Sequence, residues 1–152
     1  MPQQLYGWDE FHATNFMRGY NVALNKLDDQ DCLRTISQLG GDLFYKAKGL
    51  LQGIFENHGF RYDSSVTAIA TTTGEGRHSL VRLSNRFFDG GVGSSHRNTD
   101  DLNYGERLAS VILHELVHAL GKDHGDYNTE AGRKEHDRWN DEIYDNCFRK
   151  KH

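Results

Sequence analysis

The stretch HELVHALGKDH, residues 114–124, places three histidines and one glutamate close together in the chain. On a helix, His114 and His118 are four positions apart and project from the same face, as two imidazoles must to bind one metal ion. Glu115 is rotated by about 100° from His114, so its carboxylate is placed to take a proton from a metal-bound water rather than to bind the metal. These residue types at this spacing are typical of zinc-dependent hydrolysis.

A catalytic zinc site also requires a third protein ligand. Gly121 can end the helix in a left-handed turn, after which His124 can fold back toward the metal. We therefore predict that three histidines bind Zn²⁺ and that Glu115 is the catalytic base. The predicted ligands are His114, His118 and His124. HExxH alone recurs by chance, but the five fixed positions together favour a metal site over histidines that are merely solvated or packed.

The helix that carries this motif is predicted from apolar residues that recur every four positions before Gly121. They are Leu108, Ile112, Leu116 and Leu120. Asp100 or Asp101 is expected to cap the start of this helix. The preceding segment, 89–101, is rich in glycine and small polar residues, which predicts a long mobile loop beside the motif.

Three other helices and two strands are predicted from periodicity. The first helix lies within residues 7–27, and the second begins at a cap on Asp42 and stops at Gly59. The last helix begins at Thr129 or Asn128. Its apolar face holds His136, Trp139, Ile143 and Cys147.

The two predicted strands, at 66–73 and 79–88, have β-branched and apolar residues that alternate with other residues. The short glycine-containing turn between them favours an antiparallel pair. We therefore predict a single α+β domain over residues 1–152, in which a small mixed or antiparallel sheet packs on helices, one of them carrying HExxH.

The composition is that of a globular domain, since 36% of the 152 residues are hydrophobic and 26% are charged. The formal net charge of -4 disfavours nucleic acid as a partner, because a phosphate backbone is usually bound by a basic face. No apolar run approaches the roughly 18 residues that a membrane-spanning helix requires. We expect a monomer with no membrane segment.

Cys32 and Cys147 are the two cysteines, and neither has a second cysteine at metal-ligand spacing. Either a disulfide or two free thiols is compatible with this spacing. A bridge would favour a secreted protein, because disulfides persist in oxidising compartments. The first residues, MPQQLYGWDEF, do not have the charged and apolar regions of a secretory signal.

HELVHALGKDH resembles the signature HExxHxxGxxH of the metzincin clan of zinc metallopeptidases at all five fixed positions. The next residues, GDYN at 125–128, look most like the serralysin branch of that clan. The resemblance implies a zincin-like fold and a zinc endopeptidase that acts on a protein or peptide through a water activated by Glu115. The predicted strand at 79–88 resembles the edge strand on which zincin peptidases bind extended substrate.

The chain departs from the metzincin pattern at one position. Metzincins carry a methionine beneath the zinc, downstream of the third histidine, whereas the methionines of this chain are Met1 and Met17. Another residue must then form the floor of the site. The candidates, all from the last helix, are Trp139, Ile143 and Tyr144.

Other zincin families use a different third ligand, so a resemblance to them leaves the identity of this ligand open. In Spartan-like proteases it is a later histidine followed by an aromatic residue, which here would be His136 with Trp139. In aspzincins it is an aspartate, which makes Asp123 or Asp126 a candidate. Because His136 lies on the apolar face of the last helix, it is better explained as a half-buried packing residue than as a ligand.

Two alternatives belong to other functional classes. YbeY-type zinc endoribonucleases use three histidines at the same spacing, and the GKDH stretch matches theirs. A noncatalytic zinc-binding interaction domain would need a fourth protein ligand in a closed site. For a protease, Tyr127 and Tyr144 are candidates for stabilising the oxyanion.

Overall fold

The computed structural model describes residues 8–89 and 101–149. In chain order the elements are α1 (Glu10–Lys26), α2 (Gln30–Gly40), α3 (Ala47–Glu56), β1 (Phe60–Tyr62), β2 (Ala70–Thr73), η2 (Gly76–His78), β3 (Leu80–Leu83), α4 (Asn85–Phe88), α5 (Tyr104–Ala119), α6 (Glu130–Ile143) and η3 (Tyr144–Phe148). Helices and a small sheet form a mixed α+β fold, which confirms the predicted class. Within the described ranges, no helix has the length and apolar character needed to cross a membrane.

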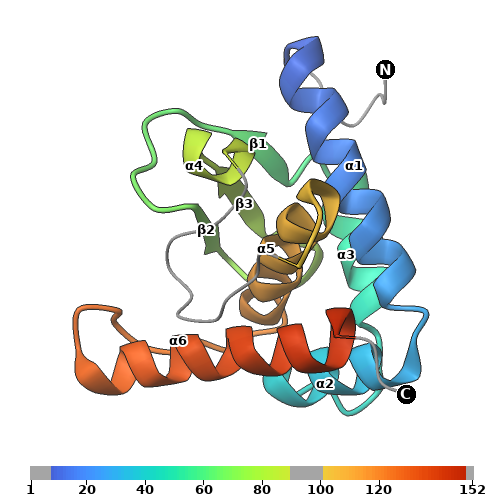
Figure 1. Cartoon of the computed structure of the whole chain (residues 1–152), viewed down its shortest axis with the longest axis vertical. Coiled ribbons are helices and arrows are strands. Elements are labelled where there is room, and N and C mark those ends of the chain that lie inside the picture. The colour runs from blue at the N-terminus through green and yellow to red at the C-terminus, as the bar shows by residue number, and fades with distance from the viewer. Residues whose placement is uncertain (1–7, 90–100, 150–152) are drawn as a thin grey trace.

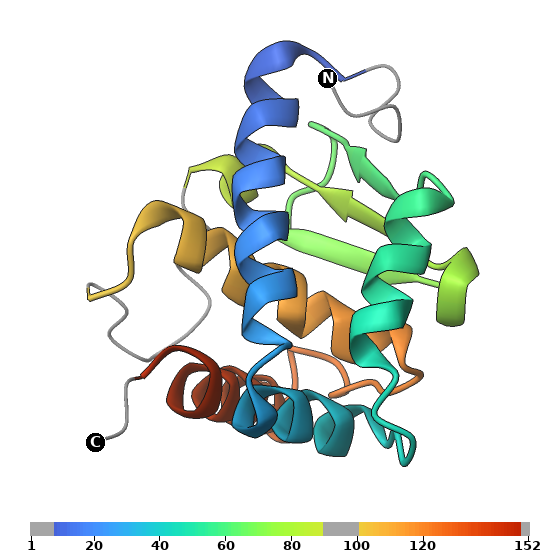
Figure 2. The ribbon, with the colours of Figure 1, turned by 90° about the vertical axis from the view of Figure 1, so that its right-hand side faces the viewer.

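Helix α5, which carries the histidine motif, lies in the middle of the molecule between the sheet and helices α1 and α3 (Figure 1). Figure 2 shows α1 crossing over α5. Gly19 of α1 permits this close approach, because a Cβ atom at that position would lie 2.6 Å from the Cβ of Leu108. Phe16, Leu108 and Ile112 are buried in the contact. The predicted apolar face of the motif helix therefore packs in the core.

The sheet has the strand order β1-β3-β2. Strand β1 runs parallel to β3 with Phe60 beside Val81, and β2 runs antiparallel with Thr72 on the other side of Val81. The antiparallel pairing of the two predicted strands is confirmed, and the sheet is mixed. Strand β1 was not predicted, because three residues are too few to show alternation.

Both strands are shorter in the structure than the sequence predicted. Strand β2 starts at Ala70, and the predicted start, Val66, lies instead in a turn in which its N–H donates to the carbonyl of Asp63. Strand β3 ends at Leu83, where Ser84 caps helix α4 with its hydroxyl instead of continuing the strand. The second half of the predicted 79–88 strand is therefore a helix.

The position of β3 corrects another prediction. This strand is central and pairs on both sides, with β1 and with β2. It therefore cannot be the edge strand that binds an extended substrate. The outer strand that reaches the histidine motif is β2, because its Thr72 hydroxyl donates to Glu115.

Helix α1 lies within the predicted range 7–27, whereas helix α2 was not predicted. Asp29 caps α2 by accepting hydrogen bonds from the N–H groups of the first helical turn. The residues that α2 buries include the polar Thr35 and Ser37. Polar residues on the buried face obscure the apolar periodicity on which the prediction depended.

The predicted cap of the next helix is wrong. The carboxylate of Asp42 accepts the N–H groups of Phe44 and Lys46, which closes a turn rather than starting a helix. Helix α3 begins only at Ala47 and has no side-chain cap. It ends at Glu56, close to the predicted stop at Gly59.

The start of the motif helix is also corrected. Asn103 caps α5 and forms a capping box with Glu106, so Asp101 is not the cap. Asp100 and most of the predicted loop, residues 90–100, lie outside the described residues.

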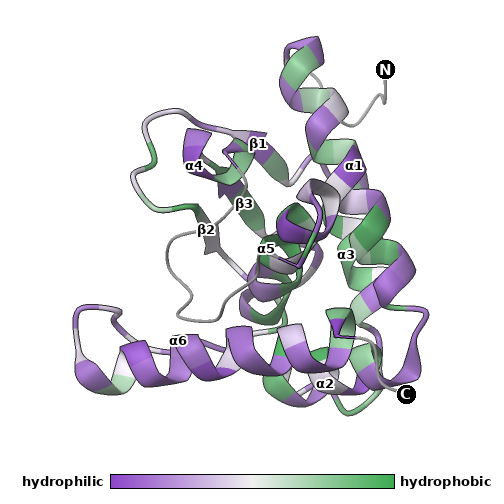
Figure 3. Cartoon of the chain, viewed as in Figure 1, coloured by the Kyte–Doolittle hydropathy of each residue, from purple (hydrophilic) through white to green (hydrophobic). Residues whose placement is uncertain are grey.

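Helix α6 is capped by Thr129, as predicted, and continues into the π-helical turn η3. The helix is hydrophilic along most of its length (Figure 3) and lies beside α2 in both ribbon views. A disulfide joins Cys32 of α2 to Cys147 of η3 across a sequence separation of 115 residues. This bridge rules out the alternative of two free thiols and ties the end of α6 covalently to α2.

We expect the Cys32→Ser/Cys147→Ser variant to have a free energy of unfolding lower by about 4 kcal/mol, because the bridge closes a very long loop in the unfolded chain. Urea denaturation of the variant and of the oxidised wild type measures the difference. Wild type treated with a reducing agent should match the variant. Equal stability of the oxidised and reduced wild type would contradict the prediction.

Candidate metal centre

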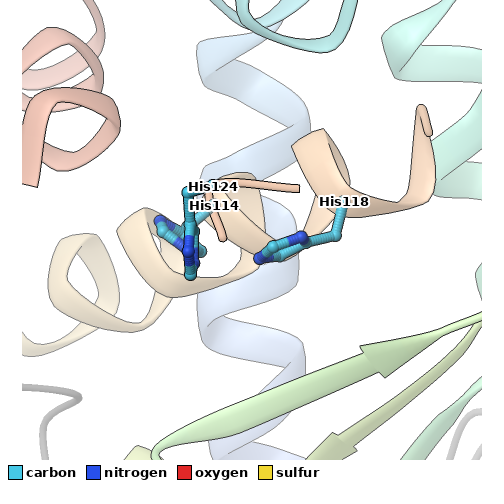
Figure 4. Close-up of side chains that lie close together, drawn as sticks. All are labelled: His114, His118 and His124. Carbon is cyan, nitrogen blue, oxygen red and sulfur yellow. The ribbon is translucent and has the colours of Figure 1, made fainter. Parts of the chain in front are cut away.

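The three predicted ligands meet at one place. His114 and His118 project from α5, and His124 reaches the same place from the segment after that helix (Figure 4). One nitrogen of each ring lies within 4.8 Å of those of the other two. Such a group could hold one metal ion.

The turn at Gly121 brings the third histidine back. Helix α5 ends at Ala119, and Gly121 has a φ of 108°, in the left-handed region that residues with side chains rarely adopt. The N–H of Gly121 donates to the carbonyl of His118 at 2.9 Å. The predicted role of this glycine in turning the chain toward His124 is therefore confirmed.

Each of the three rings is oriented by a hydrogen bond at Nδ1. The Nδ1 of His114 donates to Oδ1 of Asn140 at 2.8 Å. The Nδ1 of His118 donates to the backbone carbonyl of Lys122 at 3.0 Å, and that of His124 donates to the next carbonyl in the chain at 2.8 Å. Because every partner is an acceptor, the hydrogen sits on Nδ1 and the lone pair of Nε2 is left for a metal.

The surroundings of His114 and His118 favour the uncharged form of both rings. Burial holds the pKa of His114 well below its usual range, and the neighbouring His118 lowers it further. Burial also lowers the pKa of His118, and the neighbouring His124 lowers it further. Neutral imidazole is the form that binds a metal, so protons compete little for the ring nitrogens of His114 and His118 near neutral pH.

Glu115 lies beside the histidines but outside the three-histidine group. Its side chain is buried, and this burial raises its pKa to about 7. The hydroxyl of Thr72 donates to Oε1 at 2.8 Å, which lowers the pKa and limits this rise. A carboxyl group with a pKa near neutrality is suited to accept a proton and to release it again.

Helix α6 packs an aromatic ring against all three histidines. The ring centroid of Trp139 lies 5.3 Å from that of His114 and 5.0 Å from those of His118 and His124. Trp139 is thus the candidate floor residue that lies at the site. The hydroxyl of Tyr144 donates instead to Asp101, so the suggested oxyanion role of Tyr144 finds no support in this contact.

The alternative third ligands lie outside the group. Asp123 and Asp126 each accept a hydrogen bond from the backbone N–H two residues further along, so both carboxylates stabilise local turns. The ring of His136 is centred 4.9 Å from the rings of His114 and His124. Among the described residues, however, the group of converging nitrogens contains His124 and not His136. His136 is half-buried, as predicted, but it packs against the histidines of the site.

No family model, curated protein or solved structure matches this chain. Sequence reasoning missed Thr72 and Asn140, which contact Glu115 and His114 from 43 and 26 residues away. No spacing rule connects residues that are so far apart, and only the fold brings them together.

The donor set fits a first-row divalent metal. Three neutral imidazoles suit Zn²⁺, although other ions of this series also accept imidazole nitrogen. Among the described residues, no fourth ligand joins the group. Catalytic zinc sites combine three protein ligands with a position for water or substrate.

We expect Asn140→Leu to weaken zinc binding by about 10- to 100-fold, because the ring of His114 loses the acceptor that fixes its tautomer and orientation. Zinc titration against a competing chelator measures the affinity. Asn146→Leu is the matched control, since Asn146 donates to the backbone carbonyl of Glu142 one turn earlier. An equal loss in both variants would show that the effect is not specific to the metal centre.

We expect metal-free Glu115→Gln to be more stable than metal-free wild type at pH 9, by up to about 3 kcal/mol. The folded state raises the pKa of Glu115 from 4.5 to about 7, so the charged carboxylate destabilises the fold above pH 7. This cost disappears as the pH falls toward 4.5, where the group is neutral in the folded state. Urea denaturation at pH 5 and pH 9 measures the effect, and a difference of the same size at both pH values would argue against it.

Proposed function

We propose that this chain is a zinc-dependent endopeptidase. One observation carries the proposal: the buried carboxyl of Glu115 lies beside three histidines whose Nδ1 atoms all face acceptors. Three histidines form the group, and catalytic zinc sites use three protein ligands together with a bound water. The five matching positions of the metzincin signature support the same function, with Trp139 proposed as the floor in place of methionine.

Glu115 is the proposed proton carrier. When bound, Zn²⁺ supplies a Lewis acid that makes a coordinated water acidic near neutral pH and polarises the scissile carbonyl. Glu115 accepts the proton of the attacking water and delivers it to the leaving nitrogen as the C–N bond breaks. Thr72 donates to Oε1, which leaves Oε2 of the carboxylate to carry this proton.

Strand β2 is the proposed binding edge for the substrate. It is an outer strand of the sheet, and in the described part of the chain only β3 pairs with it. Outer strands bind extended peptides through main-chain hydrogen bonds. Because Thr72 of β2 contacts Glu115, a peptide added to this edge would lie close to the catalytic carboxyl. This arrangement suits cleavage within an extended protein segment.

The proposal extends to where and how the enzyme works. The disulfide between Cys32 and Cys147 supports a secreted enzyme, because such bridges persist in oxidising compartments. We propose that it acts as a monomer on protein or peptide substrates.

We expect Glu115→Gln to keep one zinc ion per chain and to lose casein cleavage by about 100- to 10,000-fold, because an amide cannot accept the proton of the water. Elemental analysis measures the zinc, and release of labelled casein fragments measures the rate. Glu130→Gln is the matched control, since Glu130 is exposed and pairs with Lys134 at 3.3 Å.

Cleavage by the Glu115→Gln variant at the wild-type rate would rule out the proposed base. If wild type binds one zinc but cuts no protein, the endopeptidase proposal fails and structured RNA becomes the next substrate to test. If wild type binds no zinc, the metal centre itself is excluded.

A further inference from the structure

The turn between α2 and α3 exposes three consecutive apolar side chains. Leu43 is 83% exposed, Phe44 is 76% exposed and Tyr45 is 52% exposed. Among the described residues, the other large hydrophobic side chains that are exposed are Phe11 and Tyr127, each of them separate in the chain. Single apolar residues are common on protein surfaces, whereas a contiguous exposed group marks a site of interaction. We call Leu43, Phe44 and Tyr45 the apolar turn.

The backbone of the apolar turn has a defined conformation. The carboxylate of Asp42 accepts hydrogen bonds from the N–H groups of Phe44 at 3.1 Å and Lys46 at 2.6 Å. Tyr45 has a φ of 54°, in the left-handed region where glycine is the usual residue. Strain of this kind is found mainly at functional sites. A glycine would close the turn with less strain, so the fold alone does not account for a tyrosine at this position.

The base of the apolar turn is packed into the molecule. Just before the turn, Gly40 lies so close to the end of α5 that a Cβ atom there would be 2.4 Å from Cδ1 of Leu120. Just after it, Ala47 is fully buried. In Figure 2 the connection between α2 and α3 projects from the lower edge of the molecule. The three side chains therefore extend from a rigid base, and little conformational freedom is lost when they bind a surface.

Two lysines flank the apolar turn. The ammonium group of Lys46 lies 5.5 Å from the centroid of the Phe44 ring. The side chain of Lys122 lies against Gly41, where a Cβ atom would be 2.8 Å from its Cε. Both lysines are exposed. The adjacent carboxylate of Asp42 faces backbone N–H groups, so the turn presents apolar side chains with positive charge beside them.

We propose that the apolar turn docks the protein on membrane surfaces that contain anionic lipid. Leu43 and Phe44 enter the boundary between the headgroups and the acyl chains, where apolar side chains are removed from water. Tyr45 lies at the level of the headgroups, as is usual for amphipathic rings. Lys46 and Lys122 lie beside lipid phosphates, and each lysine close to an anionic surface strengthens binding by about fivefold. The binding is peripheral and inserts side chains only.

The small size of the apolar turn favours a lipid surface over a protein partner. A stable protein interface uses about 20–30 residues on each side, and a projecting tip of three residues is far smaller. A bilayer takes up individual apolar side chains without a complementary pocket. The formal net charge of -4 opposes this binding only weakly, because charges more than about 8 Å from the lipid are screened at physiological salt.

The first test measures how much of the oxidised chain sediments with vesicles of phosphatidylcholine and phosphatidylserine in equal parts. We expect Leu43→Ser/Phe44→Ser to bind these vesicles at least about 10-fold more weakly than the wild type, because serine buries little apolar surface. Phe11→Ser is the matched control, since Phe11 is 63% exposed on α1, and it should bind as the wild type does. Circular dichroism checks that each variant is folded.

The second test removes the charges. We expect Lys46→Gln/Lys122→Gln to weaken binding to the mixed vesicles by about 25-fold, about fivefold for each lysine, and to change binding to phosphatidylcholine alone very little. Lys134→Gln on α6 is the matched control, because Lys134 is also exposed. Added salt should weaken binding of the wild type to the mixed vesicles.

Failure of the wild type to bind either kind of vesicle would overturn the proposal, and so would equal binding by the wild type and Leu43→Ser/Phe44→Ser. Full binding by Lys46→Gln/Lys122→Gln would overturn the requirement for anionic lipid. A wild-type dimer in sedimentation velocity that Leu43→Ser/Phe44→Ser fails to form would assign the apolar turn to a second copy of the chain instead. Membrane binding is measured without catalysis, so failure of the endopeptidase proposal would leave it unaffected.

Discussion

The close packing of α1 on α5 is the constraint on which the site depends. Gly19 lets the two helices approach until a side chain would not fit between them, and α5 is held between α1 and the sheet (Figure 1). His114 and Glu115 of this helix are buried although both are polar. The same burial lowers the pKa of the histidine and raises that of the glutamate. Packing thus makes one group a better metal ligand and the other a better base.

Burying these polar groups is costly unless each finds a hydrogen-bond partner. The partners come from three parts of the chain: a side chain of α6, the backbone just after α5, and the hydroxyl of Thr72 on β2. These contacts are made by Nδ1 of His114, Nδ1 of His118 and Oε1 of Glu115. The site is therefore organised before any metal or substrate arrives.

The sequence predicted the residues whose role depends on local spacing. His114, His118, Gly121 and His124 lie on one helix and its exit turn, so a helical period and a glycine were enough to bring them together. Thr72 and Asn140 could not be predicted, because their contacts depend on how β2 and α6 pack on α5. Helix α2 was missed because it buries polar residues. The second half of the predicted 79–88 strand was wrong because the hydroxyl of Ser84 caps a helix at that point, although the residues alternate as in a strand.

The disulfide supplies no ligand to the candidate metal centre, but it holds the helix that packs against that centre. Helix α6 presents Asn140 and Trp139 to the histidines, and Cys147 fastens its end to α2. A metal held by His114 and the bridge would both favour the same placement of α6, so each would strengthen the other by an equal factor. A loaded metal would make the bridge harder to reduce, and an intact bridge would slow the escape of the metal. Oxidation of the two thiols and uptake of the metal would then favour each other during maturation of the protein.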